Sequence, residues 1–129
     1  DIQIEVPPVE FSELTAKNAV EETSAQIKER VNRARSLQQE RFASGGISCN
    51  ARMTAAMVKK YCAVAEKGER LLKSLFDKLG LSARAYDKIL KVSRTIADLE
   101  GRETISAAHI SEAIRYRNLD RKIYGNNGE

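Results

Sequence analysis

Several residue types are scarce in this sequence. Its 129 residues include no tryptophan, three phenylalanines, two prolines, two cysteines and one histidine. Cys49 and Cys62 have no second pair and no histidine beside them, so neither a zinc site nor a disulfide framework is indicated, and we expect reduced thiols in a cytosolic protein. His109 has no serine, cysteine or ligand partner at a recognisable spacing, so we expect it to be structural or exposed.

Long apolar runs are missing as well. No stretch approaches the ~18 apolar residues that a membrane span needs, and the printed residues show no signal-peptide pattern. The pair Gly45-Gly46 is not followed by Gly-Lys-Ser or Gly-Lys-Thr, which excludes a phosphate-binding P-loop at that point. We therefore expect a cytoplasmic protein with no membrane partner.

The charge is unevenly distributed along the chain. The formal net charge is +4, but residues 1–22 contain six acidic residues and one lysine, whereas residues 23–129 contain 21 basic and 12 acidic residues and so carry +9. A basic body attracts nucleotides, nucleic acids or an acidic protein surface. Charge alone does not choose among them.

The apolar pattern predicts an all-α fold, a small bundle of four to five helices. Residues 1–6 alternate as in a β-strand and Pro7-Pro8 ends the pattern, so we expect one detached strand that is loose or held on the surface. Residues 1–22 are interpreted as this strand with an acidic linker, residues 23–124 as the helical domain, and residues 125–129 as a disordered tail. Helices are predicted from a Thr23 or Ser24 cap to Phe42, from Thr54 to Tyr61 or Cys62, from Glu69 to Leu79, from Ser82 to Gly101, and from Ser106 onward.

The best-marked helix lies between Gly80 and Gly101. Gly80 can end the preceding helix in a left-handed conformation, Ser82 can cap the new helix, and Gly101 can end it. Helical periodicity separates a face that we expect in the core from a polar face. The core face contains Ala85, Tyr86, Ile89, Leu90, Val92, Ser93, Ile96 and Ala97, and the polar face contains Arg84, Lys88, Lys91 and Thr95.

Arg84 is the strongest candidate for a binding residue. It falls in the first turn of this helix, beside the free backbone amides and the positive end of the helix dipole, an arrangement that suits a phosphate group. Lys88 and Lys91 continue the row and are candidates for contacts with phosphate, DNA or an adjacent subunit. The alternative is an ordinary solvated face.

The first predicted helix is rich in cations around a thin apolar stripe. Among them, Arg30, Arg33 and Arg35 are candidates for contact with a phosphate backbone or with the nucleotide of an adjacent subunit. The alternative is a surface helix whose arginine stems cover apolar neighbours. The stripe consists of Ile27, Val31, Ala34, Gln38 and Phe42.

Several separated blocks carry a resemblance to one family. The blocks are residues 1–7, Arg30 to Phe42, Asn50-Ala51, Ser82 to Tyr86, Ile89 to Val92, Arg94 to Leu99, Gly101-Arg102, Ile105-Ser106, His109-Ile110, Glu112 to Arg117 and Leu119 to Arg121. Together they resemble the C-terminal helical lid of magnesium-chelatase-subunit-like AAA+ ATPases of the ComM and YifB type, implicated in natural competence.

The resemblance implies a role for Arg84. It falls where AAA+ proteins carry the sensor-2 arginine, which reaches from the lid to the γ-phosphate of ATP. It also implies a parent protein that binds ATP and Mg²⁺, with an AAA+ core in the same chain, neighbouring subunits in a ring homo-oligomer (a hexamer), and DNA as the remodelled partner.

The resemblance also sets limits on what this chain does alone. Residues 1–7 resemble the last strand of the nucleotide-binding core, and the chain begins with Asp instead of Met, so we expect a piece of a longer protein. Walker A, Walker B, sensor-1 and arginine-finger segments are all missing from these residues, so we do not expect the piece alone to hydrolyse ATP or to bind a cofactor.

Two other function classes remain open from the residues themselves. The net charge of +9 on residues 23–129 and the arginine-rich first helix also fit a stand-alone basic helical module that binds nucleic acid. A long central helix followed by Thr-Ile-Ser and a short helix also occurs in histone-like dimerisation or adaptor domains. Salt-sensitive DNA binding favours the first, and a dimeric mass in solution favours the second.

Overall fold

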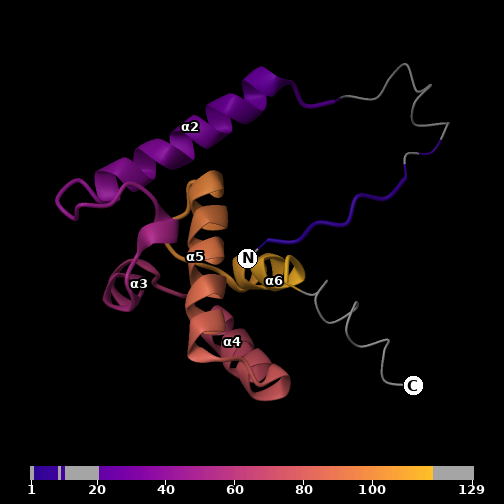
Figure 1. Cartoon of the computed structure of the whole chain (residues 1–129), viewed down its shortest axis with the longest axis vertical. Coiled ribbons are helices and arrows are strands. Elements are labelled where there is room, and N and C mark those ends of the chain that lie inside the picture. Colours follow the sequence, from indigo (N-terminus) through magenta and orange to yellow (C-terminus); the bar gives the residue numbers. More distant parts are fainter. Residues whose placement is uncertain (1, 9, 11–20, 118–129) are drawn as a thin grey trace.

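The computed structural model describes residues 2–8, 10 and 21–117 (Figure 1). Within that part the chain forms five α-helices and one 3₁₀ turn, with no β-sheet, which confirms the predicted helical bundle. Its elements are α2 (Ser24–Arg41), η1 (Asn50–Arg52), α3 (Ala55–Tyr61), α4 (Glu66–Leu79), α5 (Ala83–Glu100) and α6 (Ala107–Arg115).

The predicted capping residues fix the helix ends. Thr23 forms a capping box with Gln26, and Ser82 Oγ accepts a hydrogen bond from the Ala85 amide at 3.1 Å. Gly80 and Gly101 both end their helices with positive φ, 59° and 69°, a conformation that favours glycine. Helix α4 begins three residues earlier than predicted, at Glu66.

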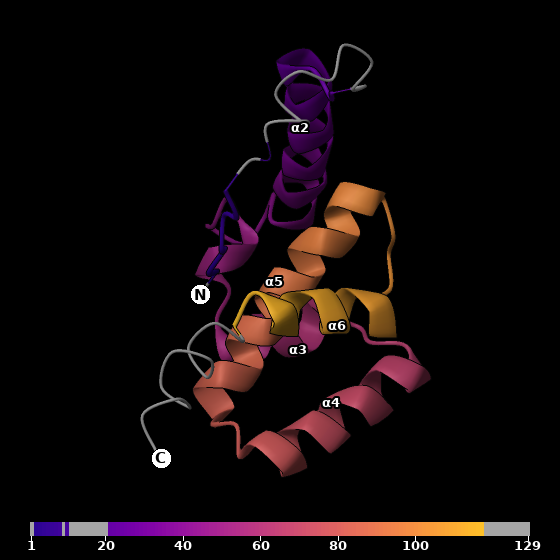
Figure 2. The ribbon, with the colours of Figure 1, turned by 90° about the vertical axis from the view of Figure 1, so that its right-hand side faces the viewer.

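Helix α5 lies at the centre of the bundle. It packs against α6, α2, α3 and η1, and α6 also packs against α4. Figures 1 and 2 show α2 and α4 at opposite ends of α5, with α6 crossing its middle. The core between them is built from aliphatic side chains, among which Ile89, Ile105, Ile110 and Val58 are almost completely buried.

A short backbone pairing aligns α4 with α6. Val64 and Ile105 form an isolated parallel bridge, in which Ile105 N–H donates to Ala63 O at 2.9 Å and Ala65 N–H donates to Ile105 O at 2.8 Å. Just beyond it, Gly68 lets α4 approach α6, because a Cβ there would lie 2.7 Å from Val64 Cγ1 and 3.3 Å from the Ala107 amide nitrogen. The start of α4 therefore lies directly against the start of α6.

His109 has a structural position. It is buried, its Nδ1 accepts a hydrogen bond from the Ser106 amide at 3.0 Å, and its Nε2 lies 2.7 Å from a Glu100 carboxylate oxygen. Because Nδ1 is an acceptor, the neutral ring carries its proton on Nε2 and donates it to Glu100. The histidine thus joins the start of α6 to the end of α5.

The N-terminal segment has no regular structure where it is described. Residues 2–8 lack strand pairing, and Gln3 N–H donates a hydrogen bond to Tyr116 O at 2.9 Å, which attaches the segment to the end of α6. Residue 1, most of the predicted acidic linker (residues 11–20) and the predicted tail (residues 125–129) lie outside the described residues.

Two apolar sets are less buried than their periodicity predicts. Tyr86, which was expected in the core, is 37% exposed, and Phe76 opposite it is 40% exposed. On α2, Ile27 and Val31 are 42% and 36% exposed, because the first half of that helix extends beyond the rest of the bundle (Figure 2). No helix in the described part is long and apolar enough to cross a bilayer.

The two cysteines are free and differ in accessibility. Cys62 is buried, and this burial raises the pKa of its thiol to about 11. In a Cys49→Ser variant, we expect maleimide labelling of Cys62 to be slow at pH 8, where about one thiol in a thousand is ionised, and to accelerate roughly tenfold per pH unit. The measurement is mass spectrometry over time, with Cys62→Ser as the control that leaves half-exposed Cys49. Equal labelling rates for the two variants at pH 8 would contradict the prediction.

Candidate functional site

A groove of about 1140 Å³ runs along α5, beside its predicted polar face. Four predicted cationic residues line it: Arg84, Lys88 and Lys91 from α5, and Arg30 from α2. Apolar side chains line it as well, three from α5 and two from the N-terminal segment, namely Val92, Ile96, Leu99, Ile2 and Ile4. The acidic residues Asp87, Glu100 and Glu112 also line it, so the groove combines apolar surface with separate positive and negative positions.

Arg84 is the least constrained of the four cations. It is exposed in the first turn of α5, two residues after the Ser82 cap. Its guanidinium has no hydrogen-bond or ion-pair partner among the described residues. Since no carboxylate of the described residues pairs with it, Arg84 can direct its charge toward a group outside the bundle.

The other groove cations are partly engaged. Arg30 donates from Nη1 and Nη2 to the two carboxylate oxygens of Glu22, and Lys91 Nζ lies 3.4 Å from the carbonyl oxygen of Ala51. Lys88 is half-buried in the same row. These residues add positive charge to the groove. Of the four cations, Arg84 is the one that lies in the first turn of a helix.

Arg33 and Arg35 are not part of this groove. Arg33 lines a separate hollow of about 610 Å³ between α2 and the end of α5, together with Glu29, Glu40 and Glu100. Arg35 is exposed on α2. The structure therefore brings together four of the six predicted cationic residues and leaves these two elsewhere on α2.

A buried ionic cluster lies beside the groove, where α2 meets α5. The Asp98 carboxylate accepts hydrogen bonds from Arg41 Nη2 at 2.6 Å and Arg41 Nη1 at 2.8 Å, and Arg94 Nε lies 3.2 Å from it. The side chains of Asp98 and Arg94 are 1% and 2% exposed. The Arg94 guanidinium also donates to the backbone carbonyls of Arg102 and Glu103, which lie between α5 and α6.

Asn50 completes this cluster. Its Nδ2 donates to Asp98 Oδ2 at 2.8 Å and to Thr95 Oγ1 at 3.1 Å, and its Oδ1 accepts from Arg41. Its backbone N–H donates to Gln38 Oε1 at 2.9 Å. The hydrogen bond to Asp98 raises the pKa of Arg41, and burial lowers the pKa of Arg94. Two arginines that share one carboxylate thus connect α2, η1, α5 and the link to α6.

Comparison with known proteins identifies the domain. Residues 21–117 match the family model described as "Magnesium chelatase, subunit ChlI C-terminal", and these residues span the whole helical bundle. The chain belongs to this family. The magnesium chelatase C-terminal domain thus carries the buried cluster and the whole groove lining except Ile2 and Ile4, which precede the matched residues.

Curated relatives of this chelatase C-terminal domain are much longer proteins. The chain is 42% identical over 123 residues to the competence protein ComM of Haemophilus influenzae, 37% to YifB of Salmonella typhimurium and 33% to YifB of Escherichia coli. Each alignment covers 95% of this chain and 23 to 24% of the relative. The chain therefore spans about a quarter of the length of these relatives.

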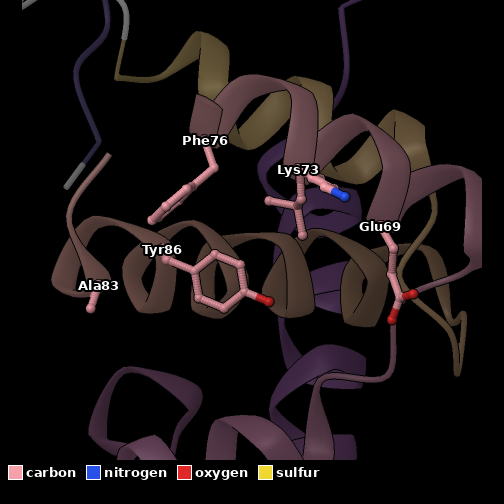
Figure 3. Close-up of a pocket in the computed structure, with 6 residues that line it drawn as sticks. Glu69, Lys73, Phe76, Ala83 and Tyr86 are labelled. Carbon is pink, nitrogen blue, oxygen red and sulfur yellow. The ribbon is translucent and has the colours of Figure 1, made fainter. Parts of the chain in front are cut away.

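The chelatase C-terminal domain also has a second, apolar hollow, between α4 and α5. Figure 3 shows Phe76 from α4 and Tyr86 from α5 beside Glu69 and Lys73 in this hollow of about 430 Å³. The two rings meet edge to face, with centroids 6.3 Å apart. This contact explains why both aromatic residues can stay near the surface: each covers part of the other.

Sequence reasoning missed the buried cluster of this chelatase C-terminal domain. Arg41 falls within the cation-rich first helix, and Arg94 and Asp98 fall within the block Arg94 to Leu99, and neither pattern predicts a buried ionic cluster. One signal was available: Arg94 and Asp98 are four residues apart and neighbour the apolar Ile96 and Ala97. A charged pair within an apolar stretch of a helix indicates that the pair is buried. Arg41, the third member of the cluster, is 57 residues away from Asp98 in sequence, and only the fold brings the two together.

Proposed function

We propose that this chain is the helical lid of a magnesium-chelatase-like AAA+ ATPase, and that Arg84 provides a sensor-2 cation to the γ-phosphate of ATP held by a core elsewhere in the same polypeptide. The observation that carries the proposal is an exposed arginine in the first turn of a capped helix, with no carboxylate partner among the described residues. A preorganised cation of this kind stabilises the charge that develops in phosphoryl transfer.

The surrounding residues fit this task. Arg30 from α2 and Lys88 and Lys91 from α5 add positive charge to the groove, which favours the approach of a polyphosphate. The described residues include no group of three or more His, Cys, Asp or Glu side chains arranged to hold a metal ion. The Mg²⁺ that accompanies ATP would therefore take its protein ligands from the core, and the lid would contribute arginine and lysine.

In this proposal the lid has a mechanical part as well. It moves relative to the core as the nucleotide changes, in a ring homo-oligomer with the hexamer as its expected size, and so couples hydrolysis to the remodelling of a partner. The name of the relative ComM, a competence protein, makes DNA the proposed partner. Arg33 and Arg35 are exposed on α2 outside the groove, which suits them for DNA or subunit contacts.

The test is an Arg84→Ala variant of the polypeptide that joins this domain to its ATPase core. Steady-state ATP turnover is expected to fall roughly 10- to 100-fold, because one preorganised cation at the γ-phosphate is lost. The thermal unfolding of the domain should stay unchanged, since Arg84 is exposed and unpaired within the described part.

The matched control is Arg102→Ala, which removes an exposed arginine just beyond the other end of α5. Its turnover should equal that of the unsubstituted protein. Unaltered hydrolysis in the Arg84→Ala protein would remove the nucleotide role from this residue.

A further inference from the structure

Helix α2 has few apolar contacts to hold it in place. Of its 18 residues, Ala34 and Gln38 are buried, while Ile27, Val31 and Leu37 are each more than a third exposed. Phe42, the residue that ends the helix, adds one buried ring. Burying an alanine and one aromatic ring at the same end resists separation of the helix from α5, but it does little to fix the angle between them.

The polar contacts of α2 are concentrated at that same end and are directional. Arg41 presents two guanidinium nitrogens to the two oxygens of Asp98, at 2.8 and 2.6 Å, and its Nη1 also reaches Asn50 Oδ1 at 3.0 Å. A planar guanidinium paired with a planar carboxylate fixes orientation as well as distance. Gln38, one turn earlier, accepts from the Asn50 amide and adds a second attachment point.

The angle of α2 matters because it places one side of the groove. Arg30 lies about three turns before Arg41 on α2 and faces the groove that Arg84, Lys88 and Lys91 line from α5. At about 1.5 Å per residue, these 11 positions separate Arg30 from its anchor by roughly 16 Å. A small rotation at Arg41 therefore changes the width of the groove at Arg30.

We propose that Arg41 and Asp98 are positioning residues that fix the angle of α2 on α5 and so set the separation between Arg30 and the cation row of α5. The inference rests on the proposed function only in taking this groove as the surface that faces the nucleotide. Arg41 is the residue to test, because Asp98 keeps Arg94 and Asn50 as partners when Arg41 is replaced, so no buried charge is left uncompensated.

The structural arm measures distances by double electron–electron resonance between spin labels in the 129-residue chain. The labels are placed at exposed Lys28 of α2 and Asp77 of α4, after Cys49→Ser and Cys62→Ala. In Arg41→Met, we expect the distance distribution between labels at positions 28 and 77 to broaden or shift. The distribution between labels at position 77 on α4 and at exposed Ser111 on α6 should stay narrow. The matched control Arg35→Met, an exposed arginine on the same helix, should change neither distribution.

The functional arm uses the polypeptide that includes the ATPase core. There Arg41→Met should lower turnover by about tenfold, because misplacement of a binding group by about 1 Å is costly. An unchanged 28–77 distribution, a broadened 77–111 distribution, or a moved α2 with normal turnover would each overturn the positioning role. If Arg84→Ala itself leaves turnover unaltered, the proposed function fails, whereas the distance result still decides whether Arg41 fixes α2.

Discussion

Replacing Asp98 with alanine is expected to lower the free energy of unfolding of the chain by about 3–5 kcal/mol, the cost typical of removing one partner from a buried ion pair. The carboxylate is the only acidic group in the cluster among the described residues, and Arg94, 2% exposed, would keep its charge in the core without a counterion. Arg41 and Asn50 would each lose a hydrogen-bond partner as well.

Urea denaturation followed by circular dichroism at 222 nm measures this loss as a lower midpoint. Asp77→Ala is the matched control, because Asp77 is exposed on α4, and its effect should stay within about 0.5 kcal/mol. A loss below about 1 kcal/mol for Asp98→Ala would mean that water or a rearranged side chain replaces the carboxylate. The cluster would then not be the anchor that we infer.

The second large effect is expected at Ile110. This side chain is completely buried on α6, the helix that packs against both α5 and α4. Ile110→Ala should cost about 3–4 kcal/mol, the sum of lost hydrophobic transfer and the cavity left between three helices. If α4 unfolds before α5 in this variant, the unfolding curve should also become less cooperative.

The same chemical change at an exposed position provides the control. Ile27 on α2 is 42% exposed, so Ile27→Ala should cost less than about 1 kcal/mol. Comparing the two variants by urea denaturation separates core packing from helix propensity, since both replace isoleucine with alanine inside a helix. Equal costs at the two sites would contradict the assignment of Ile110 to the core, or would show that the stripe of α2 is covered in solution.

The parts of the fold that sequence could predict are those with local signals. Helix α5 begins and ends where expected because Ser82 and Gly101 act on their immediate neighbours, and the same is true of Thr23, Thr54 and Ser106. The cation row of Arg84, Lys88 and Lys91 was predictable from helical periodicity alone. Membership in the chelatase C-terminal family was predictable from the separated sequence blocks, and the match over residues 21–117 confirms it.

Other features depend on contacts between distant segments and could not be predicted in this way. Arg30 joins the groove only because α2 crosses α5, and nothing in its local sequence distinguishes it from Arg33 or Arg35, which point elsewhere. Likewise, periodicity counts Tyr86 as a core residue because it shares a face with Ile89, yet the ring lies beside Phe76 near the surface. The sensor-2 role of Arg84 stays a prediction, because it concerns a contact with a nucleotide and not a contact among the described residues.

The self-capped start of α2 gives this helix a mechanical property. Thr23 and Gln26 satisfy each other's backbone amides, which stabilises the exposed start of the helix without a contact from another element. Eighteen residues make a rod about 27 Å long whose root is the arginine–carboxylate pair at its far end. A tilt of about 10° at that root would move the opposite tip of the helix by roughly 5 Å. Helix α2 can therefore act as a lever. A sub-ångström adjustment in the core becomes a displacement large enough to alter a contact with a neighbouring molecule.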